Sequence, residues 1–210
     1  MEKISPIITI GRSFGAGGRS IGKCISAILG IPFYDNEILQ EVAREFGFSK
    51  SIFARADEKR PSRFRRIISH AYGVPEAYMA DTLGPENLYQ AQSLVIRSIA
   101  RRGPCIIIGR TADYILRDFE GLVSVFLHAP LSYRALKIVE RGDAPSEVEA
   151  IEMARNKDRR RQEYYNYFTG RQWGVASNYN LTLDSSLLPS EDSARLIIEF
   201  QRRRELLIGG

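Results

Sequence analysis

The 210-residue sequence holds only two cysteines, Cys24 and Cys105, and only two histidines, His70 and His128. Each cysteine lies inside an apolar pattern, without the spacing of a metal site or a redox pair, so we expect reduced, buried thiols. Neither histidine has a nearby partner that would suggest nucleophilic or metal chemistry. We therefore interpret both histidines as structural and look elsewhere for the chemistry.

Long apolar runs are also missing, because no stretch approaches the roughly 20 residues that a membrane helix needs. The first residues, Met1 to Ile4, run straight into a strand-like segment without the layout of a signal peptide. We therefore expect a cytoplasmic protein with no membrane partner. With 44% hydrophobic and 26% charged residues, the chain fits one domain with room for a small insertion.

The net charge of +5 and the pI near 9.3 fit either a nucleic-acid binder or a cleft that holds several phosphates. A basic cluster runs from Lys59 to Arg66 and contains Phe64. A single short cluster of this kind is more often a solvated face or part of a lid. We expect no specific nucleic-acid partner, and at most weak, steeply salt-dependent binding.

Short buried runs alternate with helical patterns along most of the chain. The expected strands are residues 6–10, 31–34, 105–108, 122–127 and 179–183. Helices are expected after Gly18, at about 88–102, from a capping box at Ser146 and Glu149 to about Tyr165, and from Ser190 onward. This alternation predicts a three-layer α/β fold with a parallel sheet, whose ligands bind beyond the carboxyl ends of the strands.

A glycine-rich loop lies between the first expected strand and the first expected helix. Its members, in order, are Ser13, Phe14, Gly15, Ala16, Gly17, Gly18, Arg19 and Ser20. In the P-loop pattern G-x-x-x-x-G-K-[ST], backbone N–H groups cradle phosphates, the lysine reaches the outer phosphates and the hydroxyl meets Mg²⁺. Here Ser13 and Arg19 stand in for the first glycine and the lysine, and Ser20 keeps the hydroxyl. An ordinary turn is the alternative, but the strand before it and the helix after it favour phosphate binding.

The long helix from Ser146 places Arg155, Asp158, Arg161 and Gln162 on one face. Such a helix can hold cations over transferring phosphates while Asp158 orients an arginine or a substrate group. A solvated, salt-bridged surface helix is the alternative.

Two further side chains follow expected strands. Arg110 comes after the strand at 105–108 and Asp35 after the strand at 31–34, so both emerge where a ligand would lie. The alternatives are an arginine at the start of a helix for Arg110 and a helix N-cap for Asp35.

Taken in order, these segments resemble the cytidylate kinase-like family, a branch of the nucleoside monophosphate kinases, over nearly the whole chain. The similar segments are the loop at Ser13–Ser20, then 31–35, 108–110, 158–161 and 181–186.

The resemblance implies a P-loop kinase core at residues 1–35, 86–140 and 177–210, a monophosphate-binding insertion at 36–85 and a helical lid at 141–176. It implies ATP and Mg²⁺ as cofactors, and a nucleoside monophosphate as the second substrate. The loop would hold the donor phosphates, with Ser20 at the metal. The other implied roles are catalysis by Arg19, Arg155, Asp158 and Arg161, and acceptor binding by Asp35, Arg110, Asp113, Asp158 and Arg161.

The chain departs from this family at Arg19, where cytidylate kinases carry lysine, and at Thr111, where they carry aspartate. Asp113 could take over that role from two residues further on. The first hypothesis is transfer of the ATP γ-phosphate to CMP or dCMP, giving CDP or dCDP. The alternatives are a kinase for another small acceptor on the same fold, and a catalytically weak nucleotide-binding regulator.

Overall fold

The structure, a computed structural model, describes residues 6–35 and 85–208. Apart from Pro85, the expected insertion at 36–85 lies outside these residues, and so do the basic stretch at 59–66 and His70. No helix of the described part is both long enough and apolar enough to cross a bilayer.

Five parallel strands form one sheet in the order β2-β3-β1-β4-β5. In chain order the strands are β1 (Ile7–Arg12), β2 (Phe33–Tyr34), β3 (Cys105–Ile108), β4 (Leu122–His128) and β5 (Leu181–Asp184). The central strand β1 pairs with β3 on one side and with β4 on the other. This confirms the predicted α/β fold with a parallel sheet.

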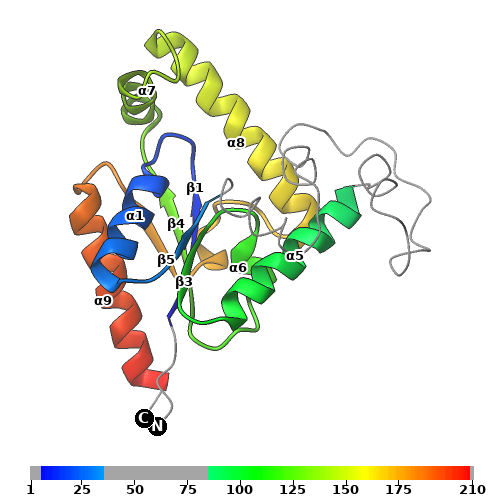
Figure 1. The fold of residues 1–210 in the computed structure, drawn as a ribbon. Coiled ribbons are helices and arrows are strands. Elements are labelled where there is room, and N and C mark those ends of the chain that lie inside the picture. Colours follow the sequence, from blue (N-terminus) through cyan, green and yellow to red (C-terminus); the bar gives the residue numbers. More distant parts are fainter. Residues whose placement is uncertain (1–5, 36–84, 209–210) are drawn as a thin grey trace.

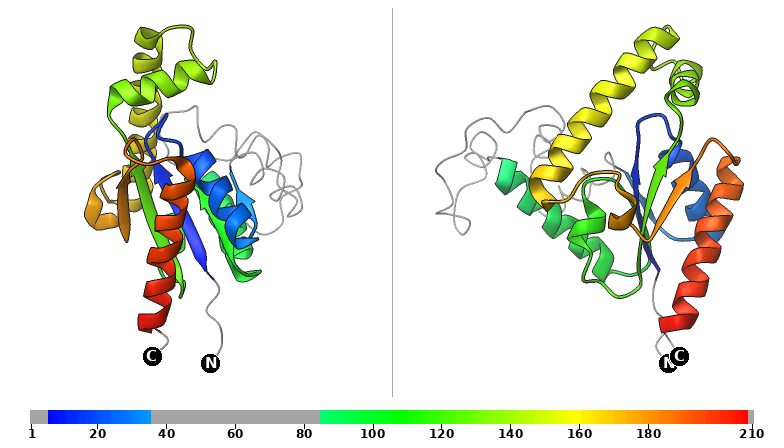
Figure 2. Two further views of the ribbon diagram at one scale, coloured as in Figure 1. Left: turned by 90° about the vertical axis from the view of Figure 1, so that its left-hand side faces the viewer. Right: turned by 180° about the vertical axis from the view of Figure 1, so that it is seen from behind.

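Helices cover both faces of the sheet, which gives three layers (Figures 1 and 2). On one face lie α1 (Gly18–Leu29) and α9 (Ser190–Ile208), and on the other lie α5 (Pro85–Arg101) and the short α6 (Ala112–Ile115). Beyond the carboxyl ends of the strands stand α7 (Leu131–Glu140) and α8 (Glu147–Thr169), and α8 descends from there toward α5. A 3₁₀ turn, Ala176–Asn178, precedes β5.

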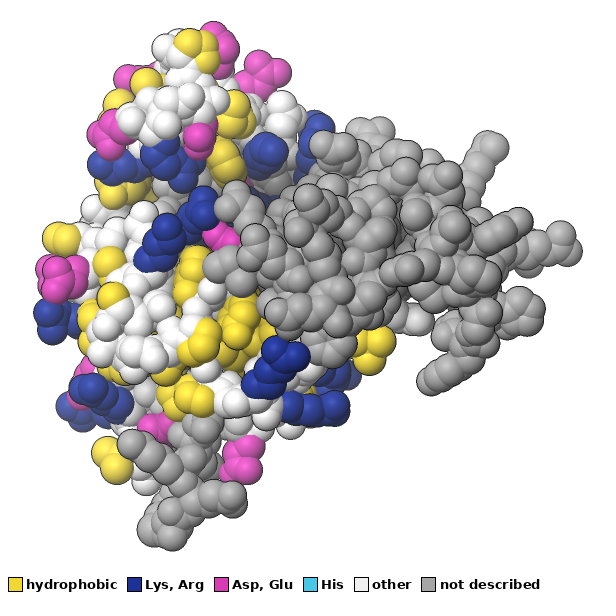
Figure 3. Space-filling model, in the orientation of Figure 1, with side chains coloured by type: hydrophobic (Ala, Val, Ile, Leu, Met, Phe, Trp, Pro, Cys, Tyr) yellow, Lys and Arg dark blue, Asp and Glu magenta, His cyan; other side chains and the backbone are white. Residues whose placement is uncertain are grey.

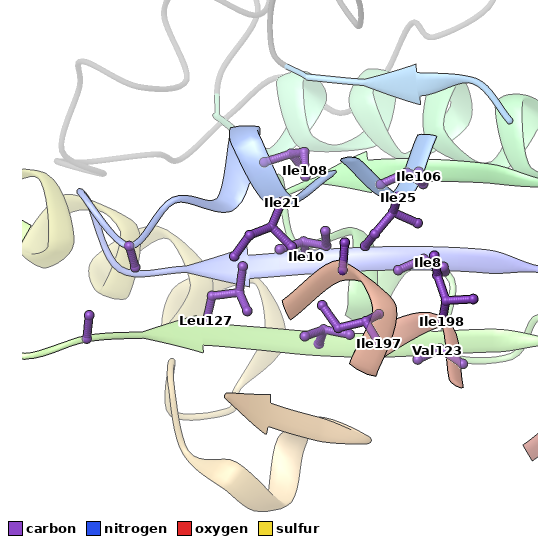
Figure 4. Packing of buried hydrophobic residues seen from close by; sticks show 14 residues of the cluster. Ile8, Ile10, Ile21, Ile25, Ile106, Ile108, Val123, Leu127, Ile197 and Ile198 are labelled. Atoms are coloured by element: carbon purple, nitrogen blue, oxygen red, sulfur yellow. The ribbon is translucent and has the colours of Figure 1, made fainter. Parts of the chain in front are cut away.

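The core follows from the period-two alternation of the buried strands. Ile8 and Ile10 of β1 pack with Ile21 and Ile25 of α1 and with the inward side of α9 (Figure 4). Ile7 points to the opposite layer, against α5 and α6. Because both faces of β1 are covered by apolar side chains, the loop that follows β1 starts from a rigid base.

The helix signals in the sequence were mostly local and mostly correct. The Ser146 side chain accepts a hydrogen bond from the Glu149 amide, as the capping box predicts. The helix then runs to Thr169, one turn beyond the predicted end, and stops at Gly170 in the left-handed conformation. This added turn carries Phe168, whose ring stacks on Tyr89 of α5 at 4.3 Å between centroids.

Candidate active site

The loop from Ser13 to Ser20 joins β1 to α1 at the carboxyl edge of the sheet. Gly15 and Gly17 have φ values of 85° and 72°, a region that residues with a Cβ adopt only under strain. Gly17, the N-cap of α1, is a glycine, so the cap residue makes no side-chain hydrogen bond to the helix end. The first-turn amides of α1 point toward the loop, which is the arrangement that a phosphate-binding loop uses.

Three other parts of the chain hold this loop in place. The Ser13 amide donates to the Leu127 carbonyl of β4 at 2.9 Å, and the Ser185 hydroxyl donates to the Ala16 carbonyl at 2.9 Å. At Gly15 the loop lies against the backbone of Arg134 in α7, where an added Cβ would come within 2.9 Å of the Arg134 carbonyl oxygen. The loop conformation is thus fixed by contacts to β4, to the segment after β5 and to α7.

Asp158 of α8 joins the loop to α7. Its carboxylate accepts a hydrogen bond from the Phe14 amide at 2.7 Å and pairs with Arg134 Nη1 at 2.6 Å. Arg134 also donates to the carbonyls of Phe14 and Ala129, each at 3.0 Å. The side chains of Arg134 and Asp158 are only 12% and 17% exposed, so solvent screens this pair weakly.

Arg161 lies one turn further along α8 and also reaches the loop. Its Nη1 donates to the Arg12 carbonyl at 3.2 Å and lies 3.7 Å from an Asp158 oxygen. The Phe14 ring has the guanidinium groups of Arg161 and Arg141 nearby, each 5.4 Å from its centroid. The structure therefore brings Asp158 and Arg161 together at the loop, on the helix face that the spacing predicted.

A pocket of about 160 Å³ opens beside the loop, between the carboxyl ends of β1 and β3 and the middle of α8. Basic and aromatic side chains dominate its described lining. The basic ones are Arg12, Arg110, Lys157, Arg160 and Arg161, and the aromatic ones are Phe14, Tyr164, Tyr165, Trp173 and Tyr179. Figure 3 shows basic side chains gathered where the α7 and α8 region meets the core. Such a lining suits an anionic ligand that carries a planar ring.

Arg110 enters this pocket from a strained backbone. After Gly109, with φ 72°, both Arg110 and Thr111 have positive φ values, 59° and 53°. The Thr111 hydroxyl donates to the Arg110 carbonyl at 2.6 Å, and the Gly109 amide donates to the Ile10 carbonyl at 3.0 Å. Non-glycine residues in this region are costly and gather at functional sites, which agrees with a binding role for Arg110.

Asp113 is the acidic member of the described pocket lining, and only 9% of its surface is exposed. Burial raises the pKa of its carboxyl, and a 2.8 Å hydrogen bond from the Tyr165 hydroxyl partly lowers it. Burial, together with the nearby Asp113 charge, raises the pKa of Tyr165 and of Tyr179. Both phenols therefore stay protonated donors at neutral pH.

The structure separates other predicted residues from this pocket. Arg19 is not part of the pocket lining, is 56% exposed, and pairs with Asp35 at 3.0 Å. Asp35 is largely buried at the end of β2. Arg155 is exposed on α8 and is not part of the pocket lining.

Sequence reasoning missed Arg12, Arg134 and the pocket aromatics. Arg134 follows no motif, because its role depends on α7 packing beside the loop. Arg12 carried a usable signal, since it is a charged residue at the end of a buried strand and directly precedes the glycine-rich loop.

A magnesium ion would find few protein ligands here. Within residues 6–35 and 85–208, no group of three or more histidine, cysteine, aspartate or glutamate side chains could hold a metal. Ser20, exposed in the first turn of α1, offers a hydroxyl beside the amides of that turn. This fits a metal that arrives bound to nucleotide phosphates and keeps several waters.

Solved structures similar to this chain share its fold. An uncharacterized protein from Eubacterium ventriosum matches with a TM-score of 0.71 and 23% identity, over 94% of this chain and 98% of that one. A gluconokinase from Sinorhizobium meliloti matches with a TM-score of 0.56 and 14% identity, over 99% and 97%. A shikimate kinase from Acinetobacter baumannii matches with a TM-score of 0.54 and 14% identity, over 98% and 97%. The fold is therefore that of the P-loop kinases.

Relatives in sequence point to one branch of that fold. A cytidylate kinase from Aeropyrum pernix is 26% identical over 193 residues, which cover 91% of this chain and 96% of the relative. The model of the cytidylate kinase-like family matches residues 7–187, from the first residue of β1 to three residues beyond β5. This chain belongs to the cytidylate kinase-like family.

Proposed function

We propose that this protein is an ATP-dependent nucleoside monophosphate kinase, with CMP or dCMP as the first candidate acceptor and CDP or dCDP as the product. One observation carries the proposal: the glycine-rich loop and the basic, aromatic pocket share one edge of the sheet, and α8 contacts both. Family membership supports the same chemistry. A cytoplasmic location, where both nucleotides are supplied, accompanies it.

The donor phosphates would lie on the amides of the loop, from Ser13 to Ser20. The left-handed Gly15 and Gly17 turn the backbone so that the N-terminus of α1 faces them. When bound with ATP, Mg²⁺ would neutralise phosphate charge, and Ser20 is the protein ligand that fits it. The P-loop pattern would make Arg19 the cation beside these phosphates, whereas in the structure its side chain is 56% exposed and pairs with Asp35.

The acceptor would occupy the pocket, with its phosphate toward Arg110 and Arg161. Its base would lie among the aromatic side chains, where ring faces supply apolar contact. Asp113 is proposed to contact the acceptor from the pocket lining, and Asp158 to act on the phosphoryl group from α8. Asp35 and Arg155 lie outside this lining, so their proposed roles in acceptor binding and catalysis would need contacts beyond this pocket. The reaction needs positioning and electrostatic stabilisation rather than a covalent enzyme intermediate.

The division into core, insertion and lid is part of the same proposal. Residues 1–35, 86–140 and 177–210 would form the core, 36–85 the monophosphate-binding insertion and 141–176 the lid. The lid would consist largely of α8, whose N-terminal half packs on α7 through a small cluster of alanines and Ile138.

A second candidate function is phosphorylation of another small acceptor on the same fold. It is favoured by Asp113, because this carboxylate accepts the Tyr165 hydrogen bond in the described pocket instead of lying open to read a base. A nucleotide-binding protein with weak turnover is the third candidate.

A coupled assay of ADP release, run with Mg²⁺, ATP and each common ribo- and deoxyribonucleoside monophosphate in turn, tests the proposal. We expect stimulation by CMP or dCMP above the rate without acceptor, and loss of that stimulation in Arg110→Met. Stimulation only by sugars, polyols or hydroxy acids supports the second candidate. No stimulation by any acceptor, with ATP still bound, supports the third and rejects the kinase.

A further inference from the structure

The side chain of Arg12 takes an unusual path from the end of β1. Its aliphatic stem crosses Gly18, where an added Cβ would lie 2.9 Å from Arg12 Cγ and 3.3 Å from its Cβ. Its guanidinium then covers Gly109, where an added Cβ would collide with Nη1. Arg12 thus passes between the first residue of α1 and the residue that follows β3.

Gly18 is a glycine for reasons of space rather than of backbone conformation. It lies inside α1 and does not have a positive φ, so any residue could adopt its backbone geometry. What excludes a side chain at this position is the stem of Arg12. The stem of Arg12, which comes from the end of β1, therefore occupies the space that a side chain at Gly18 would take, next to the first amides of α1.

This path carries the charge of Arg12 into the pocket. The residue belongs to the pocket lining together with Arg110 and Arg161, and its carbonyl accepts the hydrogen bond from Arg161. Arg19, which the sequence pattern aligned with the P-loop lysine, is 56% exposed, pairs with Asp35 and does not line the pocket. Arg12 thus lies in the pocket lining, whereas Arg19 lies outside it with an exposed side chain.

We infer that Arg12, rather than Arg19, is the cation by which the loop contacts the transferring phosphoryl group. The inference rests on the proposed kinase function. As the bond between the γ-phosphorus and the β–γ bridging oxygen breaks and a bond to an acceptor oxygen forms, Arg12 keeps its protons and donates hydrogen bonds to the phosphoryl oxygens. Its stem lies at Gly18 in the donor loop, and its forked guanidinium lies at Gly109 beside the acceptor pocket.

Three substitutions to methionine, Arg12→Met, Arg19→Met and Arg195→Met, test this assignment. Methionine keeps an unbranched stem and removes the charge. We expect Arg12→Met to lower kcat by roughly 100-fold or more, and Arg19→Met by less than about 10-fold. Arg195, exposed on α9 and paired with Glu191, is the control, and its substitution leaves kcat unchanged. A larger loss of kcat in Arg19→Met than in Arg12→Met overturns the inference.

Gly18→Ala is an independent variant that removes no charge. Its methyl group displaces the stem of Arg12, so we expect kcat to fall by roughly 10-fold or more while the thermal midpoint changes little. Wild-type kcat in a folded Gly18→Ala protein contradicts the inference, because Arg12 would then not need its observed path.

Calorimetric binding of a non-hydrolysable ATP analogue and of ADP separates this inference from the proposed function. We expect Arg12→Met to weaken binding of the triphosphate analogue by about 10-fold more than it weakens binding of ADP. Arg19→Met is expected to weaken binding of both nucleotides by the same factor. If the wild type binds nucleotides without turnover, the kinase proposal fails. The losses of triphosphate affinity in Arg12→Met and Arg19→Met still show which arginine contacts the γ-phosphate. If the wild type binds neither nucleotide, both are overturned.

Discussion

The carboxylate of Asp158 in α8 accepts a hydrogen bond from the amide of Phe14, the second residue of the glycine-rich loop, at 2.7 Å. The same carboxylate pairs with Arg134 of α7. A single aspartate therefore connects the loop to both helices that stand above it. The position of the α8 cations at the pocket depends on this connection, since Arg161 lies one turn away on the same face.

Asp158→Ala is expected to destabilise the protein by about 2 kcal/mol, because it leaves a nearly buried arginine and a loop amide without their partner. Asp158→Asn keeps an oxygen for the Phe14 amide and should lie between the alanine variant and the wild type. Urea unfolding measures both. The matched control is Glu191→Gln, which removes an exposed ion pair to Arg195 and should change stability by less than about 1 kcal/mol. Equal effects at the two sites would contradict the bridging role.

Gly15→Ala should destabilise the protein more than Gly30→Ala. Both glycines have positive φ values, 85° and 65°, so each alanine meets backbone strain of about 1 kcal/mol or more. Only at Gly15 does the new Cβ also meet backbone, 2.9 Å from the Arg134 carbonyl oxygen, whereas nothing lies within 4 Å at Gly30. Thermal unfolding of the two variants measures the difference, which we expect to exceed about 1 kcal/mol. A larger loss of stability in Gly30→Ala than in Gly15→Ala would contradict the close contact between the loop and α7.

The sequence predicted the parts of the structure that depend on local signals. Buried apolar runs located β3 and β4, the capping box located the start of α8, and the glycines with their flanking elements located the loop. The parallel sheet then placed the loop and Arg110 at the same edge, because the carboxyl ends of parallel strands lie together.

Contacts between distant segments could not be predicted in this way. Phe14 and Asp158 are separated by 144 positions and Phe14 and Arg134 by 120, and no motif marks Arg134. Alignment to the P-loop pattern assigned the cation to Arg19 by position alone. Only the three-dimensional packing shows that the stem of Arg12 fills the space at Gly18. Sequence spacing does not determine the side-chain path of Arg12, and this path is what distinguishes Arg12 from Arg19, which is exposed and paired with Asp35.

Tyr165→Phe is expected to destabilise the protein by about 1 to 2 kcal/mol. The change removes the hydroxyl that donates to buried Asp113 at 2.8 Å and leaves the carboxyl with one partner fewer. Because that hydrogen bond lowers the pKa of Asp113, its loss should raise this pKa further. Tyr167→Phe on the same helix is the control, since the hydroxyl of Tyr167 bonds to Glu86 at an exposed site.

Urea unfolding of the two variants at neutral pH measures this difference. We expect Tyr167→Phe to change stability by less than about 0.5 kcal/mol. A Tyr165→Phe protein as stable as the wild type would show that Asp113 does not need the hydroxyl and that α8 is held to α6 by packing alone.

Cys105 makes the stability of the core sensitive to alkaline pH. It is buried at the start of β3, and burial raises the pKa of its thiol from the ordinary 9.0 to about 12. Between these two values the unfolded chain loses the thiol proton while the folded chain keeps it. Deprotonation therefore favours the unfolded state, and stability falls as pH rises through this window. Below the ordinary pKa of 9.0 both states hold the proton, and the thiol adds no pH dependence.

Cys105→Ala should remove this part of the alkaline loss. The comparison is the free energy of unfolding in urea at about pH 8 and about pH 10 for the wild type, for Cys105→Ala and for Cys24→Ala. The tyrosines with raised pKa values contribute equally to all three proteins, so they cancel in the differences. We expect the Cys105 variant to lose less stability than the wild type over this interval, whatever its stability at about pH 8, and the Cys24 variant to lose as much as the wild type. Identical losses in all three would mean that the Cys105 thiol reaches solvent before the protein unfolds.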